Sequence, residues 1–167
     1  MSIRIAPMAL AYAESFHECL DEVAREKRYL AQIHAPPLDR VKDFVRESVE
    51  SDAAQFVALD GERVVGWADI FAAWPQATGH RGNLGIGVLP RYRGQGIGRQ
   101  LLEACIGKAW SKGMTRVDLE TRADNESAIA LYEKFGFRRE GVVRNGMRFD
   151  GVYYDCVLMG LLKDRGP

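Results

Sequence analysis

This chain has few cysteines and histidines and no net charge, which are features that often indicate a function directly. Its 167 residues include only three cysteines and three histidines, and its 23 basic and 23 acidic residues give a formal net charge of zero. Without net charge there is no overall field to attract nucleic acid or an anionic membrane, so any anion site must be local. We therefore expect neither nucleic acid nor a membrane as a partner.

The cysteines and histidines are also scattered along the chain. Cys19, Cys105 and Cys156 are odd in number and lack the spacing of a metal site, which predicts free thiols in a reducing compartment and no metal. No apolar run approaches the roughly 18 residues of a membrane span. Glu14 interrupts the apolar N-terminal segment, which is therefore unlike a signal peptide. These absences predict a cytoplasmic protein.

The length fits one domain with a substantial core. Hydrophobic periodicity and turn residues predict elements in the order β-α-α-β-β-β-α-β-α-β-β, an α/β fold with a mixed sheet and helices on its faces. The predicted strands cover residues 2–5, 55–59, 63–74, 84–89, 115–121, 137–143 and 152–162. The predicted helices cover residues 7–28, 38–49, 97–112 and 125–135.

Some details of these elements are specific enough to test. Pro7 is expected in the first turn of the first helix. Asp124 or Asn125 is expected to cap the N-terminus of the last helix. Asp60-Gly61 predicts a tight hairpin, while Asn145-Gly146 and Asp150-Gly151 are expected in one loop between the last two strands. The second helix is expected to direct four apolar side chains inward: Val41, Phe44, Val45 and Val49.

The most informative stretch runs from Asn83 to Trp110. An apolar strand leads through a basic, glycine-rich turn into an amphipathic helix. Three glycines leave backbone N–H groups uncovered where the helix dipole is positive, a site suited to phosphate or pyrophosphate. The alternative is a glycine-rich turn with no ligand. Three arginines in and beside the turn favour the anion site: Arg91, Arg93 and Arg99.

The spacing within this turn separates the phosphate-binding families. A Walker A loop would need Lys and then Ser or Thr after Gly98, where Arg99-Gln100 stands. A dinucleotide fingerprint would need G-x-G-x-x-G, and the third glycine here is misplaced, although Asp118 falls near the expected acid. The pattern Arg93-x-x-Gly96-x-Gly98 after Ile86-Gly87-Val88 instead resembles the acetyl-coenzyme A signature of the GCN5-related N-acetyltransferase (GNAT) family.

A second segment carries the same resemblance. Leu119-Glu-Thr-Arg-Ala-Asp-Asn125, followed by Tyr132 and then Phe135-Gly-Phe137, is similar to the family's strand–Asn–helix–Tyr segment and its Gly-Phe exit. The likeness extends from about Gln55 to Leu162. It is weak over the first fifty residues, where the family builds much of its substrate cleft.

The resemblance implies a single N-acetyltransferase domain over residues 1–167 with a mostly antiparallel sheet. It implies direct transfer of an acetyl group from acetyl-CoA to a primary amine. The expected acceptor is an amino acid-like molecule or a peptide or protein N-terminus. A homodimer is a possible assembly. The residues that it assigns to the cofactor are Ile86, Gly87, Val88, Arg93, Gly94, Gln95, Gly96, Ile97, Gly98, Arg99 and Asn125. Among these, the Val88 N–H would face the thioester carbonyl.

Gly85 and Gly87 would otherwise weaken the central strand, and we interpret them as allowing a ligand backbone to approach, or as marking a bulge.

The same comparison implies the catalytic residues. Tyr132, seven residues after Asn125, would protonate the leaving thiolate; an ordinary tyrosine has a pKa near 10. Many relatives carry a glutamate in the central strand, but this strand has no acid, so Glu120 or a bound water is expected to take the amine proton. Asp69, flanked by apolar residues, could orient a substrate ammonium. The alternatives are a non-catalytic acyl-CoA-binding regulatory module and an unrelated nucleotide-binding domain.

Overall fold

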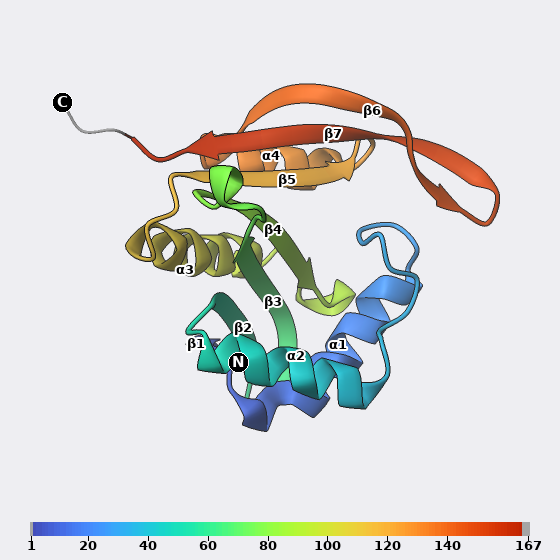
Figure 1. Cartoon of the computed structure of the whole chain (residues 1–167). Helices are drawn as coiled ribbons and strands as arrows, with labels where there is room; N and C mark the ends of the chain where they lie inside the picture. The colour runs from blue at the N-terminus through green and yellow to red at the C-terminus, as the bar shows by residue number, and fades with distance from the viewer. Residues whose placement is uncertain (1, 165–167) are drawn as a thin grey trace.

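A computed structural model describes residues 2–164 of the chain. Its centre is one seven-stranded sheet in the spatial order β1-β2-β3-β4-β5-β7-β6 (Figure 1). The strands are β1 (Ile3–Pro7), β2 (Ala54–Asp60), β3 (Arg63–Ala72), β4 (Arg81–Val88), β5 (Arg116–Arg122), β6 (Arg138–Phe149) and β7 (Val152–Leu162). The helices are α1 (Ala13–Arg25), α2 (Leu38–Glu50), α3 (Ile97–Ser111) and α4 (Glu126–Lys134). The order of elements predicted along the chain is confirmed.

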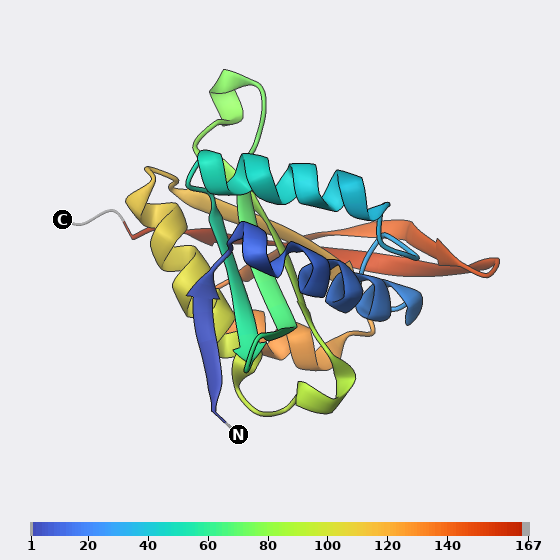
Figure 2. The same cartoon turned by 90° about the horizontal axis from the view of Figure 1, so that it is seen from below.

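Helices cover both faces of this sheet (Figures 1 and 2). On one face, Phe16 of α1 packs edge-on against Trp67 of β3, and Phe44 of α2 packs in the same way against Phe71. On the other face, α3 lies against β2 and β3, with α4 beside it. The apolar side of α3 is buried as predicted, through Ile97, Leu101, Leu102, Cys105, Ile106 and Ala109.

The sheet is mostly antiparallel, as the resemblance implies, and its single parallel pair is β4 with β5. These two strands pair only over Arg81–Asn83 and Arg116–Asp118. Beyond Asn83 they diverge, so the facing edges of Leu84–Val88 and of Leu119–Arg122 have no strand partner in that direction. This opening positions the candidate site.

Two predictions about the first fifty residues were wrong in detail. Pro7 does not open a helix: it ends β1, an edge strand where the missing N–H costs no ladder bond, and α1 begins at Ala13. In α2, Phe44 and Val49 remain 38% and 40% exposed. Ser48 is buried with Val41 and Val45 instead, because its hydroxyl donates to the Gln55 side-chain oxygen at 2.5 Å.

The link between the last two strands also differs from the prediction. Asn145-Gly146 lies within β6, where the pairing with β7 shifts register between Val143 and Met147. Glycine fits there because a Cβ on Gly146 would lie 2.8 Å from the Cys156 sulfur. The chain turns only at Asp150-Gly151, and the resulting long β6–β7 hairpin projects beyond the body of the sheet (Figure 2).

Across residues 2–164, no helix has both the length and the apolar character needed to cross a bilayer.

Candidate functional site

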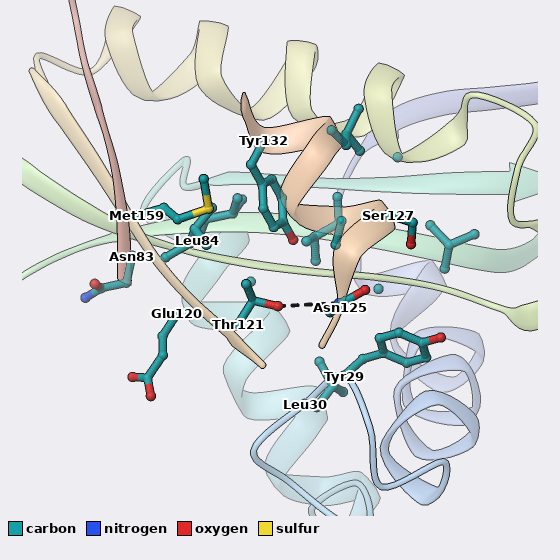
Figure 3. A pocket seen from close by; sticks show the side chains of 18 of the residues that line it. Tyr29, Leu30, Asn83, Leu84, Glu120, Thr121, Asn125, Ser127, Tyr132 and Met159 are labelled. Carbon is teal, nitrogen blue, oxygen red and sulfur yellow. Dashed lines mark hydrogen bonds between the residues drawn. The ribbon is translucent and has the colours of Figure 1, made fainter. Parts of the chain in front are cut away.

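A cavity of about 1050 Å³ occupies the opening between β4 and β5. Its wall runs from the glycine-rich turn before α3, along β4, to the first turns of α4 (Figure 3). The α1–α2 loop closes one side through Tyr29 and Leu30, and the β6–β7 hairpin contributes Met147 and Leu158. The cavity is therefore long, and elements from both faces of the sheet line it.

The glycine-rich turn provides an unobstructed row of backbone donors. Gly94 and Gly96 have φ of 72° and 79°, and no atom lies within 4 Å of a Cβ built on either. Within residues 2–164, the N–H groups of residues 94–99 have no acceptor. Glycine is required because L side chains rarely adopt this conformation. The donors therefore face open space at the positive end of α3, as an anion site requires.

Gly98 has an additional packing role. It lies inside α3, and a Cβ there would sit 3.4 Å from the Leu131 side chain of α4. The third glycine of the motif therefore lies where α4 packs against α3.

The arginines near the turn differ in how many protein partners their guanidinium groups have. Arg93 donates from Nε to the Val88 carbonyl at 2.8 Å and from both terminal nitrogens to Glu26 at 2.9 and 2.6 Å. Its guanidinium also lies 4.4 Å from the centre of the Tyr29 ring. Arg99 pairs with Glu103 on the surface. The Arg93 side chain thus joins α1, the following loop and β4, and its donors are already used by the protein.

The cavity wall contains every residue predicted to hold the cofactor except Gln95. Gln95 is exposed, and its side chain donates to the Arg91 carbonyl at 3.1 Å.

The glycines of β4 make room for side chains of β3. A Cβ on Gly87 would overlap the Trp67 ring, and one on Gly85 would lie 2.9 Å from the Asp69 carboxylate. The β3–β4 register is continuous, so there is no bulge. Our interpretation of these glycines as space for a ligand backbone was therefore incomplete: the structure assigns that space to Trp67 and Asp69.

Tyr132 lies on α4 with its hydroxyl directed into the cavity (Figure 3). It is 7% exposed and packs against Phe137 at 5.8 Å between ring centres. Among the described residues its hydroxyl has no hydrogen-bond partner. Burial raises the pKa of Tyr132 to about 12, because the apolar surroundings disfavour the phenolate.

Asn125 occupies the position before the first turn of α4 without capping it through its side chain. Its Nδ2 instead donates to the Thr121 hydroxyl at 3.4 Å (Figure 3). Asn125 is nearly buried, and with Thr121 it lines the part of the cavity into which Tyr132 points.

Glu120 is exposed on β5, on the opposite face from the buried Val117 and Leu119, as strand alternation predicted. Figure 3 shows its carboxylate directed away from Tyr132. Glu120 forms no ion pair among the described residues, whereas the neighbouring Asp118 is held by Arg81 and Arg116. The cavity therefore brings Tyr132 and Glu120 to one opening from two faces of the sheet.

The contacts that hold the α1–α2 loop at the site were not predicted from the sequence. Two contacts connect the loop to the far side of the cleft: Lys27 pairs with Asp150 at the tip of the β6–β7 hairpin, and Arg122 donates to the Lys27 carbonyl at 3.4 Å. Arg122 also stacks on Tyr154 of β7, 3.5 Å from the ring centre. No local pattern could have indicated these contacts, because their partners are about 95 and 123 positions apart.

All three cysteines are buried and unpaired. Burial raises the pKa of Cys19 to about 12 and that of Cys156 to about 11, and it also raises the pKa of Cys105. A reactive thiolate is therefore disfavoured at each position.

Comparison with known proteins agrees with this geometry. The family model described as the acetyltransferase (GNAT) family matches residues 14–137. Over 76 residues, the chain is 41% identical to the ribosomal protein bS18-alanine N-acetyltransferase of Escherichia coli K12, covering 46% of this chain and 51% of that protein. It is 36% identical over 85 residues to N-alpha-acetyltransferase 30 of Schizosaccharomyces pombe, covering 50% and 57%. The aligned part of the chain thus spans about half the length of these curated relatives.

Solved structures resemble nearly the full length of the chain. A GNAT-family acetyltransferase from Streptococcus pneumoniae superimposes with a TM-score of 0.89 at 26% identity, covering 96% of this chain and 99% of that one. A phosphinothricin acetyltransferase from Sinorhizobium meliloti, solved in complex with acetyl-CoA, superimposes with a TM-score of 0.86 at 23% identity, covering 98% and 90%. The second likeness concerns the fold alone.

Proposed function

Because the chain belongs to the GNAT family of acetyltransferases, we propose that it is an acetyl-CoA-dependent N-acetyltransferase acting directly on a primary amine. The observation that carries this proposal is the continuity of one cavity. It joins the free N–H groups before α3, the unpaired edge of β4 and the Tyr132 hydroxyl. Together these can accept a pyrophosphate, an extended amide-containing arm and a leaving thiolate.

The residues present fit acetyl-CoA, which when bound supplies an activated acetyl group as a thioester. The N–H groups of residues 94–99 would hold the pyrophosphate, with Arg99 nearby. The edge of Ile86–Val88 would pair with the pantetheine arm, with Asn125 as a further polar contact. The Val88 N–H would stabilise negative charge on the thioester oxygen, and the Arg93 contact to the Val88 carbonyl would hold that peptide in place.

Proton transfer would use two groups at the opening. Tyr132 would donate its proton to the sulfur as the C–S bond breaks, and its raised pKa keeps it protonated at neutral pH. Glu120, exposed at the other side of the opening, would bind the amine or take its proton through a water. The buried cysteines support direct transfer without an acyl-cysteine.

The acceptor that we propose is an amino acid-like molecule or a peptide or protein N-terminus. The two matched relatives are named as an alanine N-acetyltransferase of a ribosomal protein and an N-alpha-acetyltransferase, which supports a terminal α-amine. The proposal includes a cytoplasmic location, which the three free thiols support, and a single domain over residues 1–167. Residues 1 and 165–167 of that domain lie outside the described residues. A homodimer remains a prediction.

The test is a thiol-release screen with acetyl-CoA over amino acids, polyamines, aminoglycosides and short peptides, combined with calorimetry of acetyl-CoA binding. We expect binding, and CoA release with at least one amine. Binding without release on any amine would instead support an acyl-CoA-binding regulatory module. No binding of acetyl-CoA would refute the proposal.

A further inference from the structure

Asp69 is a carboxylate that the mechanism above leaves unused. It lies on β3, whose residues are buried from Val64 to Ile70 except at Asp69. Its carboxylate accepts the N–H of Gly85, a residue that lines the cavity. Because Gly85 has no side chain, nothing from β4 covers the carboxylate: a Cβ there would lie 2.9 Å from Oδ1. Asp69 is thus an acidic group beside the cavity wall in an otherwise apolar stretch.

Asp69 and Glu120 lie on the same face of the sheet, on either side of the opening. Asp69 is opposite Gly85 in the β3–β4 ladder, and Asn83, two residues earlier, is opposite Asp118 in the β4–β5 ladder. Alternation therefore places Asp69, Gly85, Asp118 and Glu120 on the face covered by α1 and α2. The last ladder pair is Asn83 with Asp118, so the two carboxylates flank the cleft just where β4 and β5 separate.

The side chains packed around Asp69 are neutral. From β2 its ladder partner Gln55 is fully buried, and the Gln55 Nε2 has no acceptor among the described residues. The buried side chains that α1 and α2 contribute are neutral, and the titratable one among them is the thiol Cys19. From α3, below the sheet, the thiol of Cys105 is near enough for the Asp69 charge to help raise its pKa. Across the cleft, β5 presents Glu120 and the arginine-paired Asp118.

This environment sets the proton affinity of the carboxyl group. Burial raises the pKa of Asp69 to about 7, and the hydrogen bond from Gly85 offsets part of that rise. A carboxylate with a pKa near the working pH is a far better proton acceptor than an ordinary aspartate.

We propose that Asp69 is the general base that removes the first proton from the acceptor ammonium, while Glu120 holds that ammonium from the other side of the cleft. The inference rests on the proposed acetyltransferase function. The ammonium gives one proton to the Asp69 carboxylate and becomes a neutral amine. As the C–N bond forms and the C–S bond breaks, nitrogen releases its second proton to water and sulfur takes the proton of Tyr132. Asp69 then releases its proton to solvent and Tyr132 is reprotonated from solvent, so one net proton is released per turnover.

The test is the pH dependence of kcat for the wild type, Asp69→Asn and Glu120→Gln, with one amine at saturation. For the wild type we expect a low-pH limb near pH 7. In Asp69→Asn that limb should be lost and kcat should fall by about 10²–10⁴-fold, the typical loss for a general base. Asp43→Asn, which alters an exposed carboxylate on α2, should behave as the wild type. In Glu120→Gln we expect a higher KM for the amine with the limb retained.

A second variant tests the geometry without removing the carboxylate. Gly85→Ala places a methyl group against Asp69 and should lower kcat and shift the limb. Gly107→Ala, on the exposed side of α3 with nothing within 4 Å, is the matched control. Two results with an active wild type would overturn the role of Asp69 and leave the acetyltransferase proposal intact. In one, Asp69→Asn keeps the low-pH limb of kcat; in the other, Glu120→Gln loses it. A wild type that releases no CoA with any amine would refute the proposed function and, with it, this inference.

Discussion

At the scale of single residues, burial changes the chemistry expected of Tyr132. The ring packs against Phe137, while the hydroxyl reaches the cavity and has no hydrogen-bond partner among residues 2–164. A phenol in this position resists ionisation, and its pKa rises to about 12. A general acid must be protonated to act, so the same burial that strengthens packing also keeps the proton in place.

Tyr132→Phe should therefore lower kcat by about 10²–10⁴-fold while the Kd for acetyl-CoA changes little, because the ring is kept and one hydroxyl is lost. The wild-type rate should show no high-pH limb from Tyr132 below about pH 11, given a pKa of about 12. Steady-state kinetics and calorimetry on both proteins measure these effects. Undiminished turnover at a chemistry-limited step would remove the acid assignment.

At the scale of elements, the turn before α3 combines a left-handed backbone that favours glycine with N–H donors that have no acceptor in the described part of the chain. Gly96 is the residue that precedes the helix, and its φ of 79° lies in the left-handed region. The backbone there has no neighbouring side chain to cover it. The turn thus exposes backbone donors to a ligand, and its left-handed backbone lowers the stability of the turn itself.

Gly96→Val should raise the Kd for acetyl-CoA at least tenfold, because the side chain would displace the backbone and cover the donors. Gly107→Val is the control: it lies in the same helix, exposed and with open space around its Cβ. Calorimetry on folded samples, checked by circular dichroism, measures the difference. Equal affinity in a folded Gly96 variant would argue against a phosphate site at the turn.

The link between α1 and β4 depends on Arg93 and Glu26, whose side chains are 30% and 25% exposed. Because both guanidinium nitrogens donate to Glu26, we expect Arg93→Ala and Glu26→Gln to be non-additive in the free energy of unfolding, with a coupling of about 0.5–3 kcal/mol. Urea unfolding of the two single variants and the double variant measures it.

The same variants distinguish two roles for Arg93 in cofactor binding. If Arg93 acts by holding the Val88 peptide, Glu26→Gln should weaken acetyl-CoA binding as Arg93→Ala does. If Arg93 binds phosphate directly, releasing it from Glu26 should leave affinity unchanged or improve it. The contacts in the structure lead us to expect the first result.

At the scale of the whole molecule, the partly buried Asp69 connects folding stability to pH. Its pKa in the folded protein, about 7, exceeds the value near 4 expected in the unfolded chain, so the folded state binds the proton more tightly. Its contribution to stability is therefore complete below pH 4 and is lost as pH rises through 7.

As the pH rises from 5 to 8, the free energy of unfolding should fall more in the wild type than in Asp69→Asn. We expect a difference on the order of 1–3 kcal/mol, reduced from the full effect because Asp69 keeps some solvent exposure. Urea titrations at both pH values measure it, with Asp43→Asn as an exposed control. Parallel pH profiles for wild type and Asp69→Asn would show that Asp69 ionises in the folded protein as freely as in the unfolded chain.

Local sequence determined much of this protein. The order of elements and the buried side of α3 follow from hydrophobic periodicity and turn residues. The resemblance carried by the two motifs indicated the residues between Ile86 and Arg99 that line the cavity, with Gln95 as the exception. These properties depend on neighbours a few residues apart, because helix and strand geometry repeat over 3.6 and 2 residues. For the same reason Glu120 was placed on the correct face of β5.

Only the tertiary structure decided which distant groups meet. Arg93 is paired with Glu26, 67 positions away, and Asp69 lies opposite Gly85 on the neighbouring strand, because strand register and helix packing bring these segments together. Neither contact has a local pattern, since each depends on where another element ends or how two strands align. The divergence of β4 and β5, which opens the cavity, likewise depends on where their shared ladder stops, and no property of either strand alone specifies that point.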